Sequence, residues 1–570
     1  MQDNSPDKPC LVETGRGFSV SYKNRFLYSK YDPKKSVLKA VADFQVLEGT
    51  LVLAFSPLLW YGIEELCAKL DKNSLILAVE TDRKLYELSK EHFPHNCPTE
   101  KILFFPIEKI QSIVQIISGT ETASGFDFPN ISRFKRARAI EMSGGTGLDR
   151  ELYGAISTAC EDAVASFWKN RITLTKMGRL YSKNIFKNLG QMRLGKTRNA
   201  FVTTIEKYIK KIRRPILVVG AGESAEITLK SLGAATEKFF VLSVDAAAPL
   251  FKSLGIVPDG IVAVESQLAI EKAYIGGGAK KSVIFADITS RNQTTLHTER
   301  EISYFATQFA PLLFLKTLRN TGFFPPQIPP LGSVGLTATL LALFFRADNS
   351  VPVFVTGLDF SFSPGKTHAN GTYPHISRLS STNRFFSAEN YGAAFRESSK
   401  SFVGKDGKIF FTDKALSSYA LMFSHTFSCE KNLFDAGECG IDLRLSKIST
   451  SEIVDFAEKM PVVREIALKN FNDTSENADK IIRYLEGEEK ALNRIKELLM
   501  FGKDVASCSV PLEKELESLI SSREYLFLHF PDGFKCNVSD LSFLKRVRAE
   551  TDFFLRVIHL ALRHSGTVSA

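Results

Sequence analysis

Small and polar residues that could bind a phosphorylated ligand follow two apolar runs in the middle of this sequence. Gly220, Gly222 and Ser224 come directly after Ile216–Val219, and Asp245 ends the next run. Glycine after a strand lets the backbone approach a ligand, and the helix start that follows presents unpaired N–H groups to an anion. Asp245 is placed to bind a ribose or sugar hydroxyl, unless it only caps the next helix.

Two later segments repeat this arrangement. Gly332 and Ser333 precede an apolar helix, and a helix start of this kind suits a phosphate or a carboxylate. Gly357 and Asp359 follow a predicted strand over Val351–Thr356. The sequence therefore predicts a ligand site to which several strand ends contribute.

The loop after Asp359 carries Lys366 and His368. A lysine can offset the charge of a leaving phosphate, and a histidine or a carboxylate can accept a proton. A single histidine is also a common structural residue, so His368 alone does not decide the chemistry. The block has no D-x-D triad at a strand end, which favours a metal-independent reaction.

These residues require a sheet that brings strand ends together. Helical segments separate several of the apolar runs between residues 203 and 446, which predicts a central α/β domain with a mainly parallel, Rossmann-like sheet. The predicted strands are Pro215–Val219, Phe239–Val244, Gly260–Val264, Ser282–Ala286 and Val351–Thr356.

The N-terminal part, residues 1–130, also predicts an α/β domain. Its apolar runs Thr50–Phe55 and Ser74–Val79 flank a helical stretch, and Glu80 stands where a Rossmann fold binds a ribose. Pro57 and bulky neighbours replace the usual glycine turn, so we expect a degenerate Rossmann-like domain. Residues 131–202 are predicted to be a linker and helical connector, with the linker character beginning at Glu121.

Residues 447–570 predict an all-helical C-terminal domain. Two apolar stripes recur at helical spacing there. They consist of Ile481, Leu485, Leu492, Ile495 and Leu499, and of Phe543, Val547, Phe554, Ile558 and Leu562.

Composition narrows the class of protein. The net charge of +10 suggests an acidic partner, but no basic run interleaved with aromatic residues indicates nucleic acid. No apolar stretch reaches the roughly 18 residues of a membrane span, and the polar residues 1–17 resemble no secretory signal. Eight scattered cysteines fit a reducing compartment, so we expect a cytoplasmic protein.

Taken together, the central segments resemble the motility accessory factor family of bacterial flagellin glycosyltransferases. Gly220–Ser224, Val244-Asp245, Gly332–Val334 and Gly357–Asp359 match its order and approximate spacing, with Thr367–Ala369. Leu27–Pro33 and Ala436–Ile441 resemble further family segments. Glu223 departs from a common proline, and Glu265 stands near a usual aspartate.

The resemblance implies a fold similar to that of CMP-sugar sialyltransferases, with no tightly bound cofactor. It implies a CMP-nonulosonic acid donor of the pseudaminic or legionaminic type, and flagellin Ser or Thr as acceptor. Gly220, Gly222, Ser224, Asp245, Gly332, Ser333 and Gly357 would then bind the donor, and His368, Asp359 and Lys366 would serve an inverting transfer. Two alternatives stay open: a pterin diphosphokinase-like phosphotransferase and a non-enzymatic flagellin-binding assembly factor.

Overall fold

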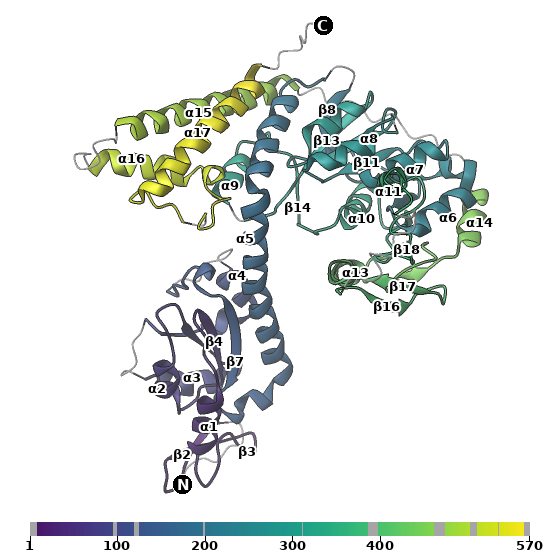
Figure 1. Ribbon diagram of the computed structural model, residues 1–570. Coiled ribbons are helices and arrows are strands. Elements are labelled where there is room, and N and C mark those ends of the chain that lie inside the picture. The colour runs from purple at the N-terminus through teal and green to yellow at the C-terminus, as the bar shows by residue number, and fades with distance from the viewer. Residues whose placement is uncertain are drawn as a thin grey trace. The chain divides into compact units, whose positions relative to one another are not determined.

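The computed structural model describes residues 8–94, 100–118, 125–197, 200–276, 278–310, 312–385, 397–460, 474–501, 510–533 and 535–563. The chain divides into two compact units, Met1–Lys176 and Met177–Ala570. Their helices and strands are drawn in Figure 1. The long helix α5 (Arg150–Met192) has residues in both.

The first unit contains a parallel sheet in the order β6-β5-β4-β7 and a small antiparallel sheet β1-β2-β3. Alternate side chains of the parallel strands enter two cores, one with α1, α2 and α3 and one with α4 and α5. Its strands are β1 (Cys10–Glu13), β2 (Phe18–Tyr22), β3 (Arg25–Phe26), β4 (Thr50–Phe55), β5 (Leu75–Val79), β6 (Ile102–Phe104) and β7 (Arg136–Glu141). Its shorter helices are α1 (Lys35–Asp43), α2 (Ile63–Ala68), α3 (Arg83–Glu91) and α4 (Ile113–Ile117).

Strand β7 corrects the prediction that residues 121–147 form a linker. It pairs in parallel with β4 at the edge of the sheet. Its charged residues Arg138 and Glu141 are exposed, as edge positions allow, and this hid the strand from a search for apolar runs.

Glu80 lies at the end of β5 as predicted, but its carboxylate is buried and bound within the protein. It accepts hydrogen bonds from the hydroxyls of Ser56 (2.7 Å) and Tyr153 (2.7 Å) and from the backbone N–H of Thr81 (2.9 Å). In this arrangement the carboxylate is occupied by the unit's own groups rather than presented to a ribose.

The second unit is built on a sheet with the order β14-β13-β12-β11-β10-β9-β15-β18-β19, with β8 also paired to β13. All of its ladders are parallel. The strands are β8 (Phe201–Thr204), β9 (Ile216–Val219), β10 (Phe240–Val244), β11 (Gly260–Ala263), β12 (Val283–Asp287), β13 (Glu301–Thr307), β14 (Gln327–Ile328), β15 (Val353–Thr356), β18 (Leu433–Asp435) and β19 (Ser446–Lys447).

The order of these strands reverses beside β9. From β9 the chain adds β10 to β14 on one side, and then returns to add β15, β18 and β19 on the other. Open parallel sheets bind ligands in the crevice at such a reversal, outside the carboxyl ends of the strands. The topology therefore singles out the ends of β9, β10 and β15.

A mostly buried helix, α10 (Val334–Phe345), packs against β9, β10, β11 and β15. Its apolar residues, among them Leu336, Leu341 and Phe345, join the core that also contains α6 (Glu223–Leu232) and α14 (Thr450–Lys459). Two further helices follow β15, α11 (Tyr373–Ser380) and α13 (Lys414–Phe427), and an antiparallel hairpin of β16 (Lys400–Val403) and β17 (Ile409–Thr412) lies between them in sequence.

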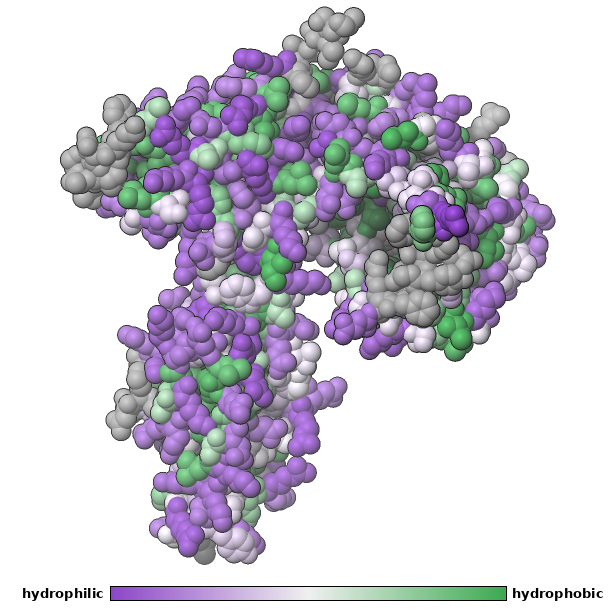
Figure 2. Space-filling view, viewed as in Figure 1, coloured by the Kyte–Doolittle hydropathy of each residue, from purple (hydrophilic) through white to green (hydrophobic). Residues whose placement is uncertain are grey.

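The C-terminal part contains α15 (Thr474–Phe501), α16 (Val510–Ser521) and α17 (Leu541–Arg563). The predicted stripe residues Ile481, Leu485, Val547 and Phe554 are buried, as expected of a helical core. In the described part of the chain, no helix is both long and apolar enough to cross a membrane. On the face drawn in Figure 2, apolar residues are scattered among hydrophilic ones.

Candidate active site

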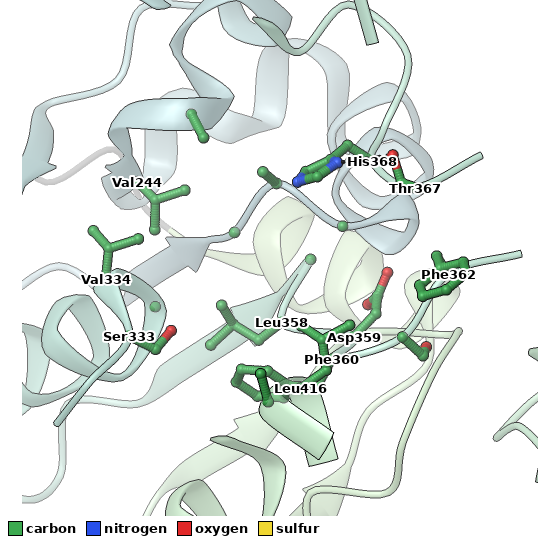
Figure 3. Close-up of a pocket in the computed structure, with 18 of the residues that line it drawn as sticks. Val244, Ser333, Val334, Leu358, Asp359, Phe360, Phe362, Thr367, His368 and Leu416 are labelled. Atoms are coloured by element: carbon green, nitrogen blue, oxygen red, sulfur yellow. Dashed lines mark hydrogen bonds between the residues drawn. The ribbon is translucent and has the colours of Figure 1, made fainter. Parts of the chain in front are cut away.

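A cavity of about 510 Å³ opens at the carboxyl ends of β9, β10 and β15. Six of the ten predicted site residues line it: Gly220, Gly222, Ser333, Gly357, Asp359 and His368. Figure 3 shows Ser333 and Val334 on one side and Asp359, Thr367 and His368 on another, with Leu358, Phe360 and Leu416 nearby. The cavity thus lies at the reversal of strand order.

Glycines allow the loops after β9 and β15 to cross at close range. The N–H of Gly222 donates to the carbonyl oxygen of Gly357 (2.8 Å), and Gly357 has a φ of +69°. A Cβ on Gly220 would lie 2.2 Å from that same carbonyl oxygen, so a side chain cannot fit without moving backbone. These glycines are therefore required by the crossing itself, besides lying at the cavity wall.

Asp359 is a buried carboxyl group at the wall of the cavity. Its Oδ2 accepts a hydrogen bond from the backbone N–H of Ser224 (2.9 Å), while its buried Oδ1 has no partner among the described residues. Burial raises the pKa of Asp359 to about 6, against the lowering effect of the Ser224 hydrogen bonds and of nearby Lys405. One oxygen is held by the Ser224 N–H, and the other is buried without a partner among the described residues.

His368 lies at the wall with its Nδ1 3.2 Å from the hydroxyl of Thr367. Arg378 of α11 donates to that hydroxyl (3.3 Å). Burial and the charge of Arg378 both lower the pKa of His368, so the imidazole is neutral near pH 7. A neutral imidazole can accept a proton.

The start of α10 gives the cavity a place for an anion. Ser333 is the N-cap residue, and its side chain makes no capping hydrogen bond. The first N–H groups of a helix have no partner within it, and their dipoles favour negative charge. No lysine or arginine is among the described residues that line the cavity. The positive end of the α10 dipole, at the backbone N–H groups of Val334 and Gly335, is therefore the feature of this wall that favours an anion.

Four predicted site residues do not line the cavity. Ser224 is buried, and its hydroxyl accepts from the N–H of Cys439 (2.9 Å). Gly332 precedes the start of α10 and lies against Tyr419. The other two are Asp245, whose Oδ2 is buried without a partner among the described residues, and Lys366, which is ion-paired.

Asp245 is fully enclosed at the end of β10, between the wall residues Val244 and Ala246. Its Oδ1 accepts from the N–H of Ala246 (2.8 Å), and burial raises the pKa of its carboxyl group to about 7.

Lys366 binds two glutamates of α6. Its Nζ lies 3.4 Å from Oε1 of Glu223 and 3.4 Å from Oε2 of Glu226. The hydroxyl of Ser363 also donates to Glu223 (2.8 Å). Glu223, which replaces a common proline of the resembling family, therefore ties the loop after β15 to α6. Burial opposes ionisation of Glu226, but the Lys230 hydrogen bond and the charge of Lys366 lower its pKa to about 2.

Comparison with known proteins agrees with this fold. Residues 183–365 match the family model described as "MptE-like: 6-hydroxymethylpterin diphosphokinase MptE-like". An uncharacterized protein of Treponema pallidum (strain Nichols) is 31% identical over 571 residues, covering 96% of this chain and 95% of the relative. The solved structure of the MAf glycosyltransferase from Magnetospirillum magneticum AMB-1 matches with a TM-score of 0.50 and 12% identity, covering 97% and 91% of the two chains.

Residues 183–365 therefore form an MptE-like domain, and the chain as a whole shares its fold with a MAf glycosyltransferase. The mixed α/β fold with its large parallel sheet, expected from the sequence, is confirmed. At 12% identity the structural similarity establishes the fold, and the chemistry has to be argued from the site.

Other wall residues were not anticipated from the sequence. They come from the loop after β15 and from the segment that leads into α13: Phe360, Phe362, Thr367, Ser399, Asp413, Ala415 and Leu416. Asp413 caps α13 by accepting from the N–H groups of Ala415 and Leu416 (both 2.9 Å). An aspartate before a helical run predicts such a cap, but nothing in the sequence predicts that this helix start meets the carboxyl edge of β15.

Proposed function

We propose that this protein is a glycosyltransferase of the motility accessory factor type, which moves a nonulosonic acid from a CMP-activated donor to Ser or Thr of flagellin. The observation that carries the proposal is the cavity at the strand reversal. Its wall includes the N-terminus of α10 and Asp359, whose Oδ1 has no partner among the described residues. The fold similarity to a solved MAf glycosyltransferase supports the reaction class.

The donor would bind at the ends of β9, β10 and β15. The backbone around Gly220 and Gly222 would contact the nucleotide, and the N–H groups of Val334 and Gly335 would donate hydrogen bonds to its phosphate. The described cavity wall carries Asp359 and Asp413 but no lysine or arginine. Phosphate binding would therefore depend on the N-terminus of α10 rather than on side-chain cations. The leaving CMP gains negative charge as the glycosidic bond breaks, and the helix dipole stabilises that charge.

Asp359 would accept the proton of the acceptor hydroxyl through Oδ1 while the Ser224 N–H holds Oδ2. With a pKa of about 6, its carboxyl group is mostly ionised near neutral pH yet basic enough to take a proton. The hydroxyl oxygen then forms a bond to the anomeric carbon as the bond to CMP breaks. A single displacement of this kind inverts the anomeric centre.

His368 is the alternative base. With Asp359 as the base, His368 would instead position the acceptor hydroxyl. Lys366 would act at a distance from the reacting atoms, because its ammonium group is bound to Glu223 and Glu226. Its role in this proposal is to fix the loop that presents His368.

The family match favours one second candidate. The matched model describes 6-hydroxymethylpterin diphosphokinases, so a transfer of diphosphate from ATP to a hydroxymethylpterin has to be tested beside sugar transfer. The described residues contain no group of three or more His, Cys, Asp or Glu side chains that could hold a metal ion. We propose a reaction that needs no divalent cation, and a chelator tests this directly.

The test uses the purified full chain with flagellin and CMP-pseudaminic or CMP-legionaminic acid, with and without EDTA. We expect release of CMP and a matching gain in flagellin mass in both conditions. A parallel reaction with ATP, Mg²⁺ and 6-hydroxymethylpterin should give no AMP. Release of AMP without any sugar transfer would replace the glycosyltransferase proposal with the second candidate.

A further inference from the structure

A second group of charged residues lies along the same edge of the sheet as the cavity. The part of α5 after Met177 crosses the carboxyl ends of β11 and β12 and is bound there through two asparagines. Nδ2 of Asn184 donates to the carbonyl oxygens of Ser266 (3.3 Å) and Thr289 (2.9 Å). Asn188 donates in the same way to Ile288 (2.8 Å) and Ser290 (3.1 Å).

Lys183 and Lys187 precede these asparagines by one residue each, so they lie one turn apart on one face of the fixed helix. Both side chains are half-buried. Within the described part of the chain, neither ammonium group has a hydrogen bond or an ion pair. Half-buried lysines of this kind lose solvation and receive no carboxylate in return.

The nearest charges are also positive. Burial lowers the pKa of Lys183, as do the charges of Lys187, Arg291 and Arg179, and burial with the charge of Arg291 lowers the pKa of Lys187. Arg291 follows β12 and binds Glu271 through Nε (2.6 Å), which leaves its terminal nitrogens without a partner among the described residues. Asn292, the residue after Arg291, donates through Nδ2 to Oδ1 of Asn188 (3.3 Å), so Arg291 lies beside the stretch of α5 that carries the two lysines. Glu271 neutralises Arg291 only in part.

We propose that Lys183, Lys187 and Arg291 form a binding site for a phosphate or carboxylate group, separate from the cavity at β9 and β15. An anion between the three side chains would remove their mutual repulsion and supply the hydrogen-bond acceptors that they lack. The buried hydroxyl of Ser290 in the surrounding loop is a hydrogen-bond donor that also has no partner among the described residues. This anion site is a separate proposal, and it does not depend on the proposed glycosyl transfer.

The experiment measures lysine acylation by sulfo-NHS-acetate in the native full-length protein, followed by peptide mass spectrometry. Lys281 is the reference, because it is an exposed lysine at the opposite, amino end of β12. A lowered pKa increases the fraction of free amine, so Lys183 and Lys187 should react faster than their burial alone would allow. Inorganic phosphate or N-acetylneuraminic acid should slow both lysines several-fold relative to Lys281, at constant ionic strength.

The two probes separate the two sources of the anion: protection by phosphate alone indicates a phosphoryl ligand, and protection by N-acetylneuraminic acid indicates a sugar carboxylate. Protection of Lys187 should disappear in Lys183→Met, whereas Lys280→Met, a change of another exposed lysine that leaves the reference Lys281 in place, should retain it. If sodium chloride slows labelling as much as either probe, or if neither probe slows it, the site does not exist.

Discussion

At the scale of single residues, the proposed chemistry depends on a carboxyl group at the cavity wall, one oxygen of which is buried without a partner among the described residues. Asp359 follows the tight turn at Gly357, and the next residue, Phe360, has a φ of +46°. A bulky residue in the left-handed region stores backbone strain that the surrounding structure has to maintain. The strain beside Asp359 and its unpartnered Oδ1 are the two observations behind the role that we propose for this residue.

Asp359→Asn tests this carboxyl group directly. The amide oxygen can still accept from the Ser224 N–H, but it cannot take a proton, so we expect transfer to fall by at least ~100-fold while CMP binding stays within a few-fold. Asp413→Asn is the matched control, because Asp413 lines the same cavity but caps α13. Steady-state kinetics and calorimetric titration with CMP measure the two effects. Equal losses of transfer in both variants would remove Asp359 from the mechanism.

The pH dependence of stability gives a second measure of Asp359. Its pKa of about 6 lies above the ordinary value of 3.8, so the folded state binds this proton more tightly than the unfolded state does. Its contribution to stability is complete below pH 3.8 and is lost as the pH rises through 6, by up to about 3 kcal/mol. In urea melts, Asp359→Asn should lack this loss and should exceed the wild type in stability at pH 7. A difference between the two proteins that is constant from pH 4 to 8 would contradict the assignment.

For His368→Ala we expect a loss of turnover with donor binding intact, since the imidazole is neutral and faces the cavity. The comparison variant is His425→Ala, whose side chain is exposed on α13 and outside the cavity wall. Transfer assays and CMP titrations on both variants give the result. Unchanged turnover in His368→Ala would leave Asp359 as the base without assistance.

At the scale of elements, the site depends on two loops that cross where the strand order reverses. The crossing explains why glycine occupies positions 220, 222 and 357, each of which has no room for a Cβ. Helix α6 starts after β9 and α10 starts after β14, and the first residues of both lie at this edge of the sheet.

Gly220→Ala tests the crossing. A methyl group would collide with the Gly357 carbonyl, and we expect the free energy of unfolding to fall by about 1–3 kcal/mol, with weaker CMP binding. Gly154→Ala provides the contrast, because a Cβ there meets nothing within 4 Å and α5 should gain about 0.5–1 kcal/mol. Denaturant melts compare the two. A neutral Gly220→Ala would mean that the loops do not cross as closely as described.

The sequence predicted the strands that are buried on both faces, because their residues form an unbroken apolar run. Strands β4, β5, β9, β10, β12 and β15 are buried on both faces, so each forms a continuous apolar run. Strand β13 begins with Glu301, which binds Lys207, and carries Ser303 and Tyr304, so the same rule missed it. Polar residues can be buried when partners in distant segments satisfy them, and a sequence does not reveal those partners.

The sequence predicted those parts of the candidate site whose position follows from the strand topology alone. Residues at the ends of β9 and β15 meet because neighbouring parallel strands end at one edge. Asp245 also follows a strand at this edge, but its side chain is enclosed beside Ala246, and Lys366 is bound by Glu223. Side-chain direction and ion pairing follow from packing, which residue spacing does not determine.

At the scale of the whole molecule, the C-terminal helices of the second unit depend on α5. Phe186 of α5 is fully buried and its ring contacts Phe314, Tyr525 and Phe554 (centroids 5.9, 5.1 and 5.8 Å apart). Arg179, also on α5, binds Glu550 of α17 at 2.7 Å and lies over the ring of Phe553. One helix therefore supports both the C-terminal helices and the carboxyl ends of β11 and β12.

Phe186→Ala should lower the free energy of unfolding by about 3–5 kcal/mol, because a buried aromatic ring is replaced by a cavity. Ile172→Ala, at an exposed position of the same helix, should change it by less than about 0.5 kcal/mol. Thermal or urea unfolding monitored by circular dichroism provides the measurement. A small effect of Phe186→Ala would show that the C-terminal helices are held by other contacts.

The central claim, transfer of a nonulosonic acid to flagellin, is tested most directly by the intact mass of flagellin co-expressed with this protein in a host that makes CMP-pseudaminic or CMP-legionaminic acid. The account predicts mass increments equal to whole nonulosonate residues with the wild-type protein and none with Asp359→Asn or without the protein. Unmodified flagellin in the presence of folded wild-type protein and donor would contradict it, and co-purification of that flagellin would favour a binding factor.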